Sequence, residues 1–303
     1  MRFSVWPSPQ RPWADVRHIV RHCDDAGWDG AYFADHFMPD DPDGRPADGA
    51  VLECWSVLAA VAAETTRLRV GSLVSGNLYR HPAVVANAAA TIDHISNGRF
   101  VLGLGAGWQV NEHAAFGIDL LDVPDRLDRL EESCTVVRSL LDNARTDFSG
   151  RHYRITAAPC DPKPVQARLP LLVGGSGERR TMRIAARHAD EWNAWGTAAD
   201  FERRRGVLDD HCAAVGRDPT QITRSTQAIV YLSTDETWLA HRRSATGGRA
   251  SLLGTPAEMV EQVAAYHAVG VDELIVPDWM MGSASRTVDT LDLFWNEVAV
   301  HFR

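Results

Sequence analysis

The sequence predicts an α/β protein that folds as a closed (β/α)8 TIM barrel with long loops at its C-terminal mouth. Short apolar runs alternate with helix-length amphipathic segments along all 303 residues, which is the pattern of a parallel sheet. Eight such strand–helix alternations can be counted, and eight parallel strands close into a barrel. An open, doubly wound sheet is the alternative fold.

The expected strands alternate with helical patterns along the chain. They are Arg2–Trp6, Gly30–Ala34, Leu68–Val74, Arg99–Leu104, Leu169–Val173, Glu191–Ala194, Thr223–Leu232 and Glu273–Val276. Helical patterns such as Ala83–Ile95 and Asp125–Asn143 lie between them. Gly98 and Gly270 each stand just past a helical pattern, where a left-handed residue is favoured before the next strand. A chain of this length is typical of one TIM barrel, so we expect residues 1–303 to form a single domain.

Composition limits the kind of protein and its partners. Apolar residues make up 45% of the chain, which suffices for a large core, and the net charge of −9 argues against a nucleic-acid partner. The N-terminal "MRFSVWPSPQ" lacks the apolar core of a signal peptide, and no apolar run is long enough to span a bilayer. The five cysteines are scattered and suit free thiols in a reducing cytosol. We expect a cytoplasmic protein with a small-molecule substrate and no membrane partner.

One strand ends with an adjacent carboxylate and imidazole. In "GAYFADHFMPDD" the apolar run stops at Asp35 and His36, and in a TIM barrel the C-terminal strand ends form the active site. The pair either ties down the strand end or places chemistry there. The long loop Phe37–Glu53 follows, and a second long excursion follows Leu232, where lids and substrate loops are expected.

Tryptophan is concentrated at the expected strand ends. Five of the ten tryptophans fall there: Trp6, Trp108, Trp192, Trp195 and Trp279. An aromatic wall at the mouth suits a flat ring system. The alternative interpretation is that these side chains only fill the end of the barrel.

Two glycine-rich segments follow strands. In Gly174–Gly177, small residues before a helical pattern let backbone N–H groups and the helix dipole bind an anion such as phosphate, although a plain tight turn is the alternative. The glycines of "GLGAG", Gly103–Gly107, do not have the spacing of a dinucleotide fingerprint and let the backbone lie close to a bulky ligand. We predict no metal site, because His18 and His22 have helical spacing but no third ligand.

Several blocks together resemble a known family. They are "YFADHF", "VGSLVSGNLYRHPAVVANAAATIDHISNGRFVLGLGAGW", "LLVGGSGERRTMRIAARHADEWN" and "GTPAEMVEQVAAYHAVGVDELIV". Nearly the whole chain resembles the bacterial luciferase-like monooxygenase superfamily, and most closely its branch of F420-dependent oxidoreductases. The resemblance implies a luciferase-like TIM barrel that forms a homodimer and holds the deazaflavin coenzyme F420, or a flavin such as FMN, at its C-terminal mouth.

The resemblance also implies which residues contact the cofactor. These are Asp35, Ser72, Leu73, Val74, Gly107, Trp108, Asn111, Gly174, Gly175, Ser176 and Gly177. The glycine segment would receive the phosphate, and a bulge within Gly71–Val74 would pack behind the ring, with a non-proline cis peptide expected at Ser72–Leu73.

Asp35 and His36 match the Asp-His pair of the deazaflavin-dependent sugar-phosphate dehydrogenases of this family. In those enzymes the histidine lies near the reactive ring carbon as a base or a stabiliser of the transition state. Two departures separate this chain from them, because Trp108 stands in place of an acidic general acid and Asp40 in place of a tryptophan. The hydride-transfer core therefore matches, and the sugar-phosphate substrate does not.

We hypothesise an F420-dependent oxidoreductase that transfers a hydride between the deazaflavin and a small organic substrate. His36 would move the proton, because an unperturbed imidazole titrates near neutral pH, and Asp35 would orient His36 or hydrogen-bond the ring. One alternative is an FMN-dependent monooxygenase that uses molecular oxygen, and a second is a non-catalytic flavin-binding barrel.

Overall fold

Eight parallel strands close into a barrel in the computed structural model, which describes residues 1–244 and 249–303. The strands are β1 (Arg2–Trp6), β2 (Gly30–Phe33), β3 (Arg69–Ser72), β5 (Phe100–Gly105), β8 (Leu171–Gly174), β9 (Glu191–Asn193), β10 (Thr223–Gln227) and β13 (Glu273–Pro277). They pair in the order β3-β2-β1-β13-β10-β9-β8-β5, and β5 pairs back to β3. The predicted TIM barrel is confirmed, and each predicted strand overlaps one of these eight.

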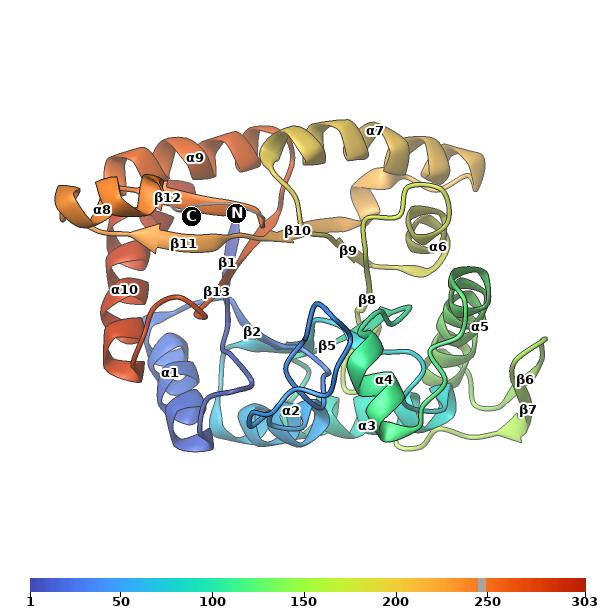
Figure 1. Ribbon diagram of the computed structural model, residues 1–303. Helices are drawn as coiled ribbons and strands as arrows, with labels where there is room; N and C mark the ends of the chain where they lie inside the picture. The colour runs from blue at the N-terminus through green and yellow to red at the C-terminus, as the bar shows by residue number, and fades with distance from the viewer. Residues whose placement is uncertain (245–248) are drawn as a thin grey trace.

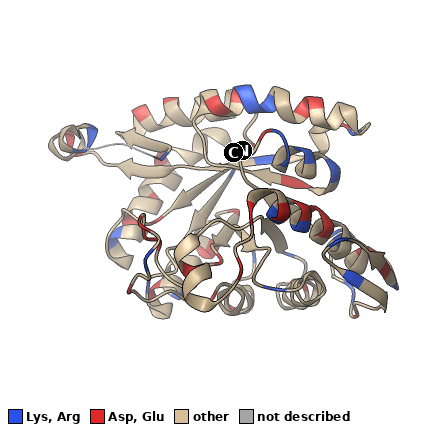
Figure 2. Ribbon diagram, turned by 45° about the vertical axis from the view of Figure 1, so that its right-hand side comes forward, with Lys and Arg blue, Asp and Glu red and all other residues tan. Residues whose placement is uncertain are grey.

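Helices surround the barrel (Figure 1). They are α1 (Trp13–Ala26), α2 (Cys54–Glu64), α3 (Pro82–Ile95), α5 (Val123–Asp142), α6 (Thr181–His188), α7 (Ala198–Ala214), α9 (Pro256–Ala268) and α10 (Ala284–Glu297). Charged residues are frequent on the helices and few on the strands (Figure 2), as expected when one helix face packs on the sheet. No helix among the described residues has both the length and the apolar character needed to cross a bilayer.

Local signals explain where the helices begin and end. Thr197 and Thr255 each form a capping box, with Asp200 and Glu258 respectively, at the starts of α7 and α9. The two glycines predicted to be left-handed after helices have φ of 80° at Gly98 and 84° at Gly270, so that prediction is confirmed.

The predicted strand Thr223–Leu232 is two strands. β10 pairs with β13 only as far as Gln227, and Ile229–Leu232 forms β11, which leaves the barrel and pairs with β12 (Ser251–Gly254) in a separate two-stranded sheet. The excursion after Leu232 is therefore not a plain loop, because it contains α8 (Glu236–Arg243) and β12. Its residues 245–248 lie outside the described residues.

The remaining elements decorate the barrel. The hairpin of β6 (Thr146–Ser149) and β7 (Arg154–Ala158) and the short helix α4 (Val110–Phe116) were not predicted. β4 (Ser75–Gly76) and the 3-10 helices η1 (Pro219–Gln221) and η2 (Ala299–Phe302) complete the set. The predicted long loop Phe37–Glu53 contains neither helix nor strand.

A buried charge network fills the N-terminal end of the barrel. Arg69 bonds both Glu191 and Glu273, and Ser4 donates to Glu273 at 2.5 Å. Burial raises the pKa of Glu191, against the lowering effect of Arg69. Buried charges are tolerated when they are paired in this way. Paired side chains thus occupy the interior at this end of the barrel.

A bulge after β3 forms part of the wall at the mouth. The non-proline cis peptide lies at Leu73–Val74, so the predicted position Ser72–Leu73 is wrong by one residue. The hydrogen bonds between β3 and β2 continue as far as the Leu73 amide, which donates to the Phe33 carbonyl at 2.7 Å. The chain therefore leaves the strand direction only after Leu73. Glycine on the neighbouring strands makes room for the bulge, since a Cβ at Gly174 would lie 2.7 Å from a Val74 methyl group.

Candidate active site

A cavity of about 1010 Å³ opens at the C-terminal strand ends. The bulge residues Leu73 and Val74 form one wall. Another part of the lining is aromatic, with the Trp6 and Trp279 rings 4.8 Å apart and Trp195 6.0 Å from Trp6. Ligand pockets are concave and largely apolar, commonly about 300–1,000 Å³ in volume. This cavity therefore has room for a ring-bearing ligand together with a second small molecule.

Four of the five predicted mouth tryptophans line this cavity: Trp6, Trp108, Trp195 and Trp279. The prediction is wrong for Trp192, which is fully buried against Phe201 outside the barrel. Successive strand side chains point to opposite faces, so Glu191 points inward and Trp192 outward. The Trp192 indole donates to the Gly175 carbonyl at 2.9 Å and supports the glycine turn from behind.

Asp35 lines the cavity and also ties down the end of β2. Its Oδ2 accepts from the Ser75 hydroxyl at 2.9 Å, the Gly76 amide at 3.1 Å and Arg80 at 2.6 Å. Arg80 also bonds Glu53, so the same arginine fixes the start of α2. The other oxygen, Oδ1, is buried without a partner among the described residues. A buried carboxylate oxygen without a donor is costly, and a bound ligand could supply that donor.

His36 is oriented by Glu112 and not by Asp35, so that part of the prediction is wrong. The His36 Nδ1 and Glu112 Oε1 atoms are 2.8 Å apart, and the Glu112 side chain is completely buried. An ionised carboxylate can only accept, so Nδ1 bears a proton, and in the neutral imidazole Nε2 is then the nitrogen with the lone pair. His36 lines the cavity, and its Nε2 has no hydrogen-bond partner among the described residues. The edge of His36 also meets Trp108, with ring centroids 5.5 Å apart.

Glu112 gathers three donors from two segments of the chain. Besides His36, the Tyr79 hydroxyl donates to Oε1 and the Phe37 amide donates to Oε2 at 2.7 Å. Burial alone would raise the pKa of Glu112, but these hydrogen bonds outweigh burial and hold its pKa below the ordinary value. Burial and the bond to Glu112 raise the pKa of Tyr79. Glu112 is therefore an anion and Tyr79 a neutral donor at neutral pH.

The glycine turn after β8 lines the cavity only in part. Gly174, Gly175 and Ser176 do so, together with Thr181 at the start of α6, whereas Gly177 does not. A Cβ at Gly177 would lie 2.7 Å from the Thr181 hydroxyl oxygen, so the turn fits closely against the helix start. Backbone N–H groups and a helix N-terminus in this arrangement suit an anion.

Of the other residues predicted to contact the cofactor, some line the cavity and others lie behind its walls. Gly107 and Trp108 line the cavity, but Ser72 and Asn111 do not. The Ser72 hydroxyl donates to the Gly103 carbonyl at 2.9 Å, and Asn111 donates to the carbonyls of Pro39 and Arg45 at 2.9 and 3.2 Å. Both residues thus fix the walls of the site. The cofactor contacts expected of Ser72, Asn111 and Gly177 stay predictions.

Several residues of the site were not named as site residues from the sequence. They are Tyr79, Gln109, Glu112, Asn193, Gln227 and Arg249, of which all but Glu112 line the cavity. Gln227 ends β10, so a correct strand boundary would have included it among the strand ends. No comparable local signal marks Tyr79 or Arg249.

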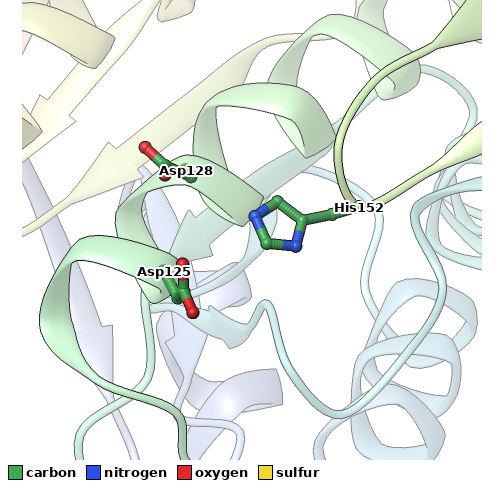
Figure 3. Close-up of side chains that lie close together, drawn as sticks. All are labelled: Asp125, Asp128 and His152. Atoms are coloured by element: carbon green, nitrogen blue, oxygen red, sulfur yellow. The ribbon is translucent and has the colours of Figure 1, made fainter.

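A group of possible metal ligands lies outside the cavity. Asp125 and Asp128 on α5 face His152 in the β6–β7 turn, and one ligand atom from each lies within 4.8 Å of the others (Figure 3). Arg151 pairs with both carboxylates, and Arg180 also pairs with Asp128. The arginines already supply the counter-charge that a cation would bring.

Comparison with known proteins establishes the family. Residues 1–246 match the family model described as luciferase-like monooxygenase, and the chain belongs to this family. The chain is 32% identical over 198 residues to an F420-dependent glucose-6-phosphate dehydrogenase of Microbacterium testaceum. The aligned region covers 64% of this chain and 57% of that relative. It is 29% identical over 225 residues to an F420-dependent hydroxymycolic acid dehydrogenase of Mycobacterium tuberculosis, and this alignment covers 72% of this chain and 60% of that relative. The chain thus spans less than two thirds of the length of these curated relatives.

A solved structure shares the fold across the whole chain. The coenzyme F420-dependent tetrahydromethanopterin reductase of Methanopyrus kandleri superimposes with a TM-score of 0.84 and covers 100% of this chain and 99% of its own, at 17% identity.

We predict that Glu112→Gln destabilises the protein by about 2 kcal/mol at pH 7, because an amide offers one acceptor oxygen to three donors and one donor loses its partner. The pKa of Glu112 is lowered in the folded protein. The stability that the Glu112 carboxylate contributes is therefore fully present above its pKa in the unfolded chain, about 4.3. This contribution is lost as pH falls through the lower pKa of Glu112 in the folded protein. Urea unfolding at pH 7 and at successively lower pH measures this.

Glu261→Gln is the matched control, since Glu261 is exposed on α9 and its change should stay within about 0.5 kcal/mol. Equal stability of Glu112→Gln and the wild type at pH 7 would contradict the role given to Glu112.

Proposed function

We propose that the protein is an F420-dependent oxidoreductase that transfers a hydride between coenzyme F420 and a small organic substrate. The observation behind this proposal is the fixed imidazole of His36, whose Nδ1 is bonded to Glu112 and whose side chain lines a large cavity. The names of two curated relatives, both F420-dependent dehydrogenases, support the choice of cofactor.

The cavity fits the coenzyme in three respects. Leu73 and Val74 present an apolar surface for one face of a flat ring. The buried Oδ1 of Asp35 lacks a donor, which a ring N–H can supply. The turn at Gly174–Ser176 and the start of α6 suit the phosphate. When bound, F420 supplies the two-electron acceptor or donor, and the protein supplies orientation and proton handling.

His36 would handle the proton. Its neutral Nε2 can accept a proton from a substrate hydroxyl during oxidation, and the imidazolium can return the proton in the opposite direction. Glu112 would fix the tautomer and stabilise the imidazolium through the 2.8 Å bond to Nδ1. Trp108, packed on the edge of His36, would shield this proton from bulk water.

We further infer that the chain works as one domain, as a homodimer and in the cytoplasm. Pairing of the first barrel strand with the last, β1 with β13, supports a single domain. The exposed apolar side chains of Val110, Phe116 and Val123 on and beside α4 support an interface with a second copy. The five cysteines are all buried and unpaired, as suits a reducing compartment.

Titration of the purified protein with F420 and with FMN, followed by ligand fluorescence, tests the proposed cofactor. We expect F420 to bind at least about tenfold more tightly, a difference of about 1.4 kcal/mol. Tight binding of FMN with none of F420 would favour oxygen-dependent monooxygenase chemistry instead. Binding of reduced F420 without turnover of any alcohol, aldehyde, ketone or enone would favour a non-catalytic barrel.

His36→Ala should lower turnover roughly 10²-fold or more, because the variant lacks the proton-transfer group. Its affinity for F420 should change little if His36 serves the reaction and not the binding. His18→Ala, an exposed histidine on α1, is the control and should keep full activity. Wild-type turnover by a His36→Ala enzyme that still binds the cofactor would remove His36 from the proposed mechanism.

A further inference from the structure

An arginine without a counter-charge stands at the aromatic part of the cavity. Arg249 lines the cavity, and its guanidinium lies 5.4 Å from the ring centroids of both Trp195 and Trp279. It forms no ion pair or hydrogen bond with any residue in 1–244 or 249–303. Among the described side chains that line the cavity, it is the only lysine or arginine.

The acidic groups of the cavity do not neutralise Arg249. Asp35 is paired with Arg80 at 2.6 Å, and Asp200 accepts from Thr197 in the capping box of α7. Asp40 is exposed and lies more than 4.0 Å from the guanidinium, since the two form no ion pair. A positive charge held over two indoles is thus available to a ligand.

Buried polar groups of the same cavity also lack partners. Gln227, at the end of β10, is 3% exposed, and its buried side-chain oxygen has no donor among the described residues. Within the same described part of the chain, the buried Trp6 indole N–H has no acceptor. Burying an unpaired polar group costs about 1–3 kcal/mol, so both groups indicate a ligand with polar atoms at this end of the cavity.

We propose that the substrate is an organic anion whose carboxylate or phosphate binds Arg249 and whose flat apolar body contacts Trp195 and Trp279. The planar guanidinium matches two anionic oxygens at once, and indole rings suit a flat apolar body. Gln227 and the Trp6 N–H would bond further polar atoms of the same molecule. This inference rests on the proposed function, because it concerns the substrate of that same site.

Arg249 and the glycine turn belong to different segments of the chain. The glycine turn follows β8, whereas Arg249 contacts side chains that follow β9 and β13, and it belongs to the segment between β11 and β12. Substrate and coenzyme would therefore present their negative groups to different parts of the cavity.

Calorimetric titration of the F420-loaded protein with benzoate, phenyl phosphate and the neutral benzamide tests the proposal. At least one of the two anions should bind about tenfold or more tightly than benzamide, as expected for a charge-assisted bond. Arg249→Gln should abolish this preference and Arg249→Lys should retain part of it. Arg242→Gln is the matched control, because Arg242 also stacks on aromatic rings, Tyr231 and Trp238, but does not line the cavity.

Three outcomes would overturn the proposal. They are equal binding of the anions and benzamide by the wild type, a preference that persists in Arg249→Gln, and a loss in Arg249→Gln of F420 affinity alone. The last outcome would assign Arg249 to the coenzyme. If F420 does not bind at all, the proposed function fails, and the same titrations without coenzyme still decide whether Arg249 binds the anion.

Discussion

The site depends on one buried carboxylate. Glu112 accepts hydrogen bonds from His36 and Phe37 in the loop after β2, and from Tyr79 in the segment after β4. Glu112 itself lies in the first turn of α4. Segments that are far apart in the chain therefore share one anion. Because a buried anion must keep its donors, the position of His36 is fixed before any ligand binds, which lowers the cost of orienting the proton-transfer group.

The two ends of the barrel differ in structure, and this difference supports the site. Paired charges around Arg69 fill the N-terminal end, and the C-terminal end stays open. At the open end, glycine on β5 and β8 leaves space for the Val74 side chain. The bulge can then present an apolar face to the cavity without pushing the neighbouring strands apart. The wall for a flat ring thus depends on two residues outside the bulge, Gly105 and Gly174, because neither has a side chain that would collide with Val74.

Much of the fold could be predicted from the sequence because its signals are local. Apolar runs and helix-ending glycines such as Gly98 lie within a few residues of the structure they specify. The merger of β10 and β11 into one predicted strand has a local cause as well, since only Ala228 separates them and no turn residue marks the break. That error hid Gln227, which ends β10.

The site was less predictable because its contacts are distant in sequence. Glu112 lies 76 residues from His36 and 33 from Tyr79, so no spacing rule joins them. The strand-end position of Asp35 and His36 did identify the right part of the barrel. Of the two roles predicted for Asp35, the orientation of His36 was wrong, because the residue that orients it, Glu112, is distant in sequence. Residues such as Arg249 depend on how a long excursion folds back over the mouth, which short-range patterns do not encode.

A crystal structure with F420 bound tests the central claim most directly. The account predicts the ring against Leu73 and Val74, with His36 still bonded to Glu112 through Nδ1 and its Nε2 directed at the open face of the ring. A ring bound away from the bulge, or a His36 turned from the ring and released from Glu112, would contradict it.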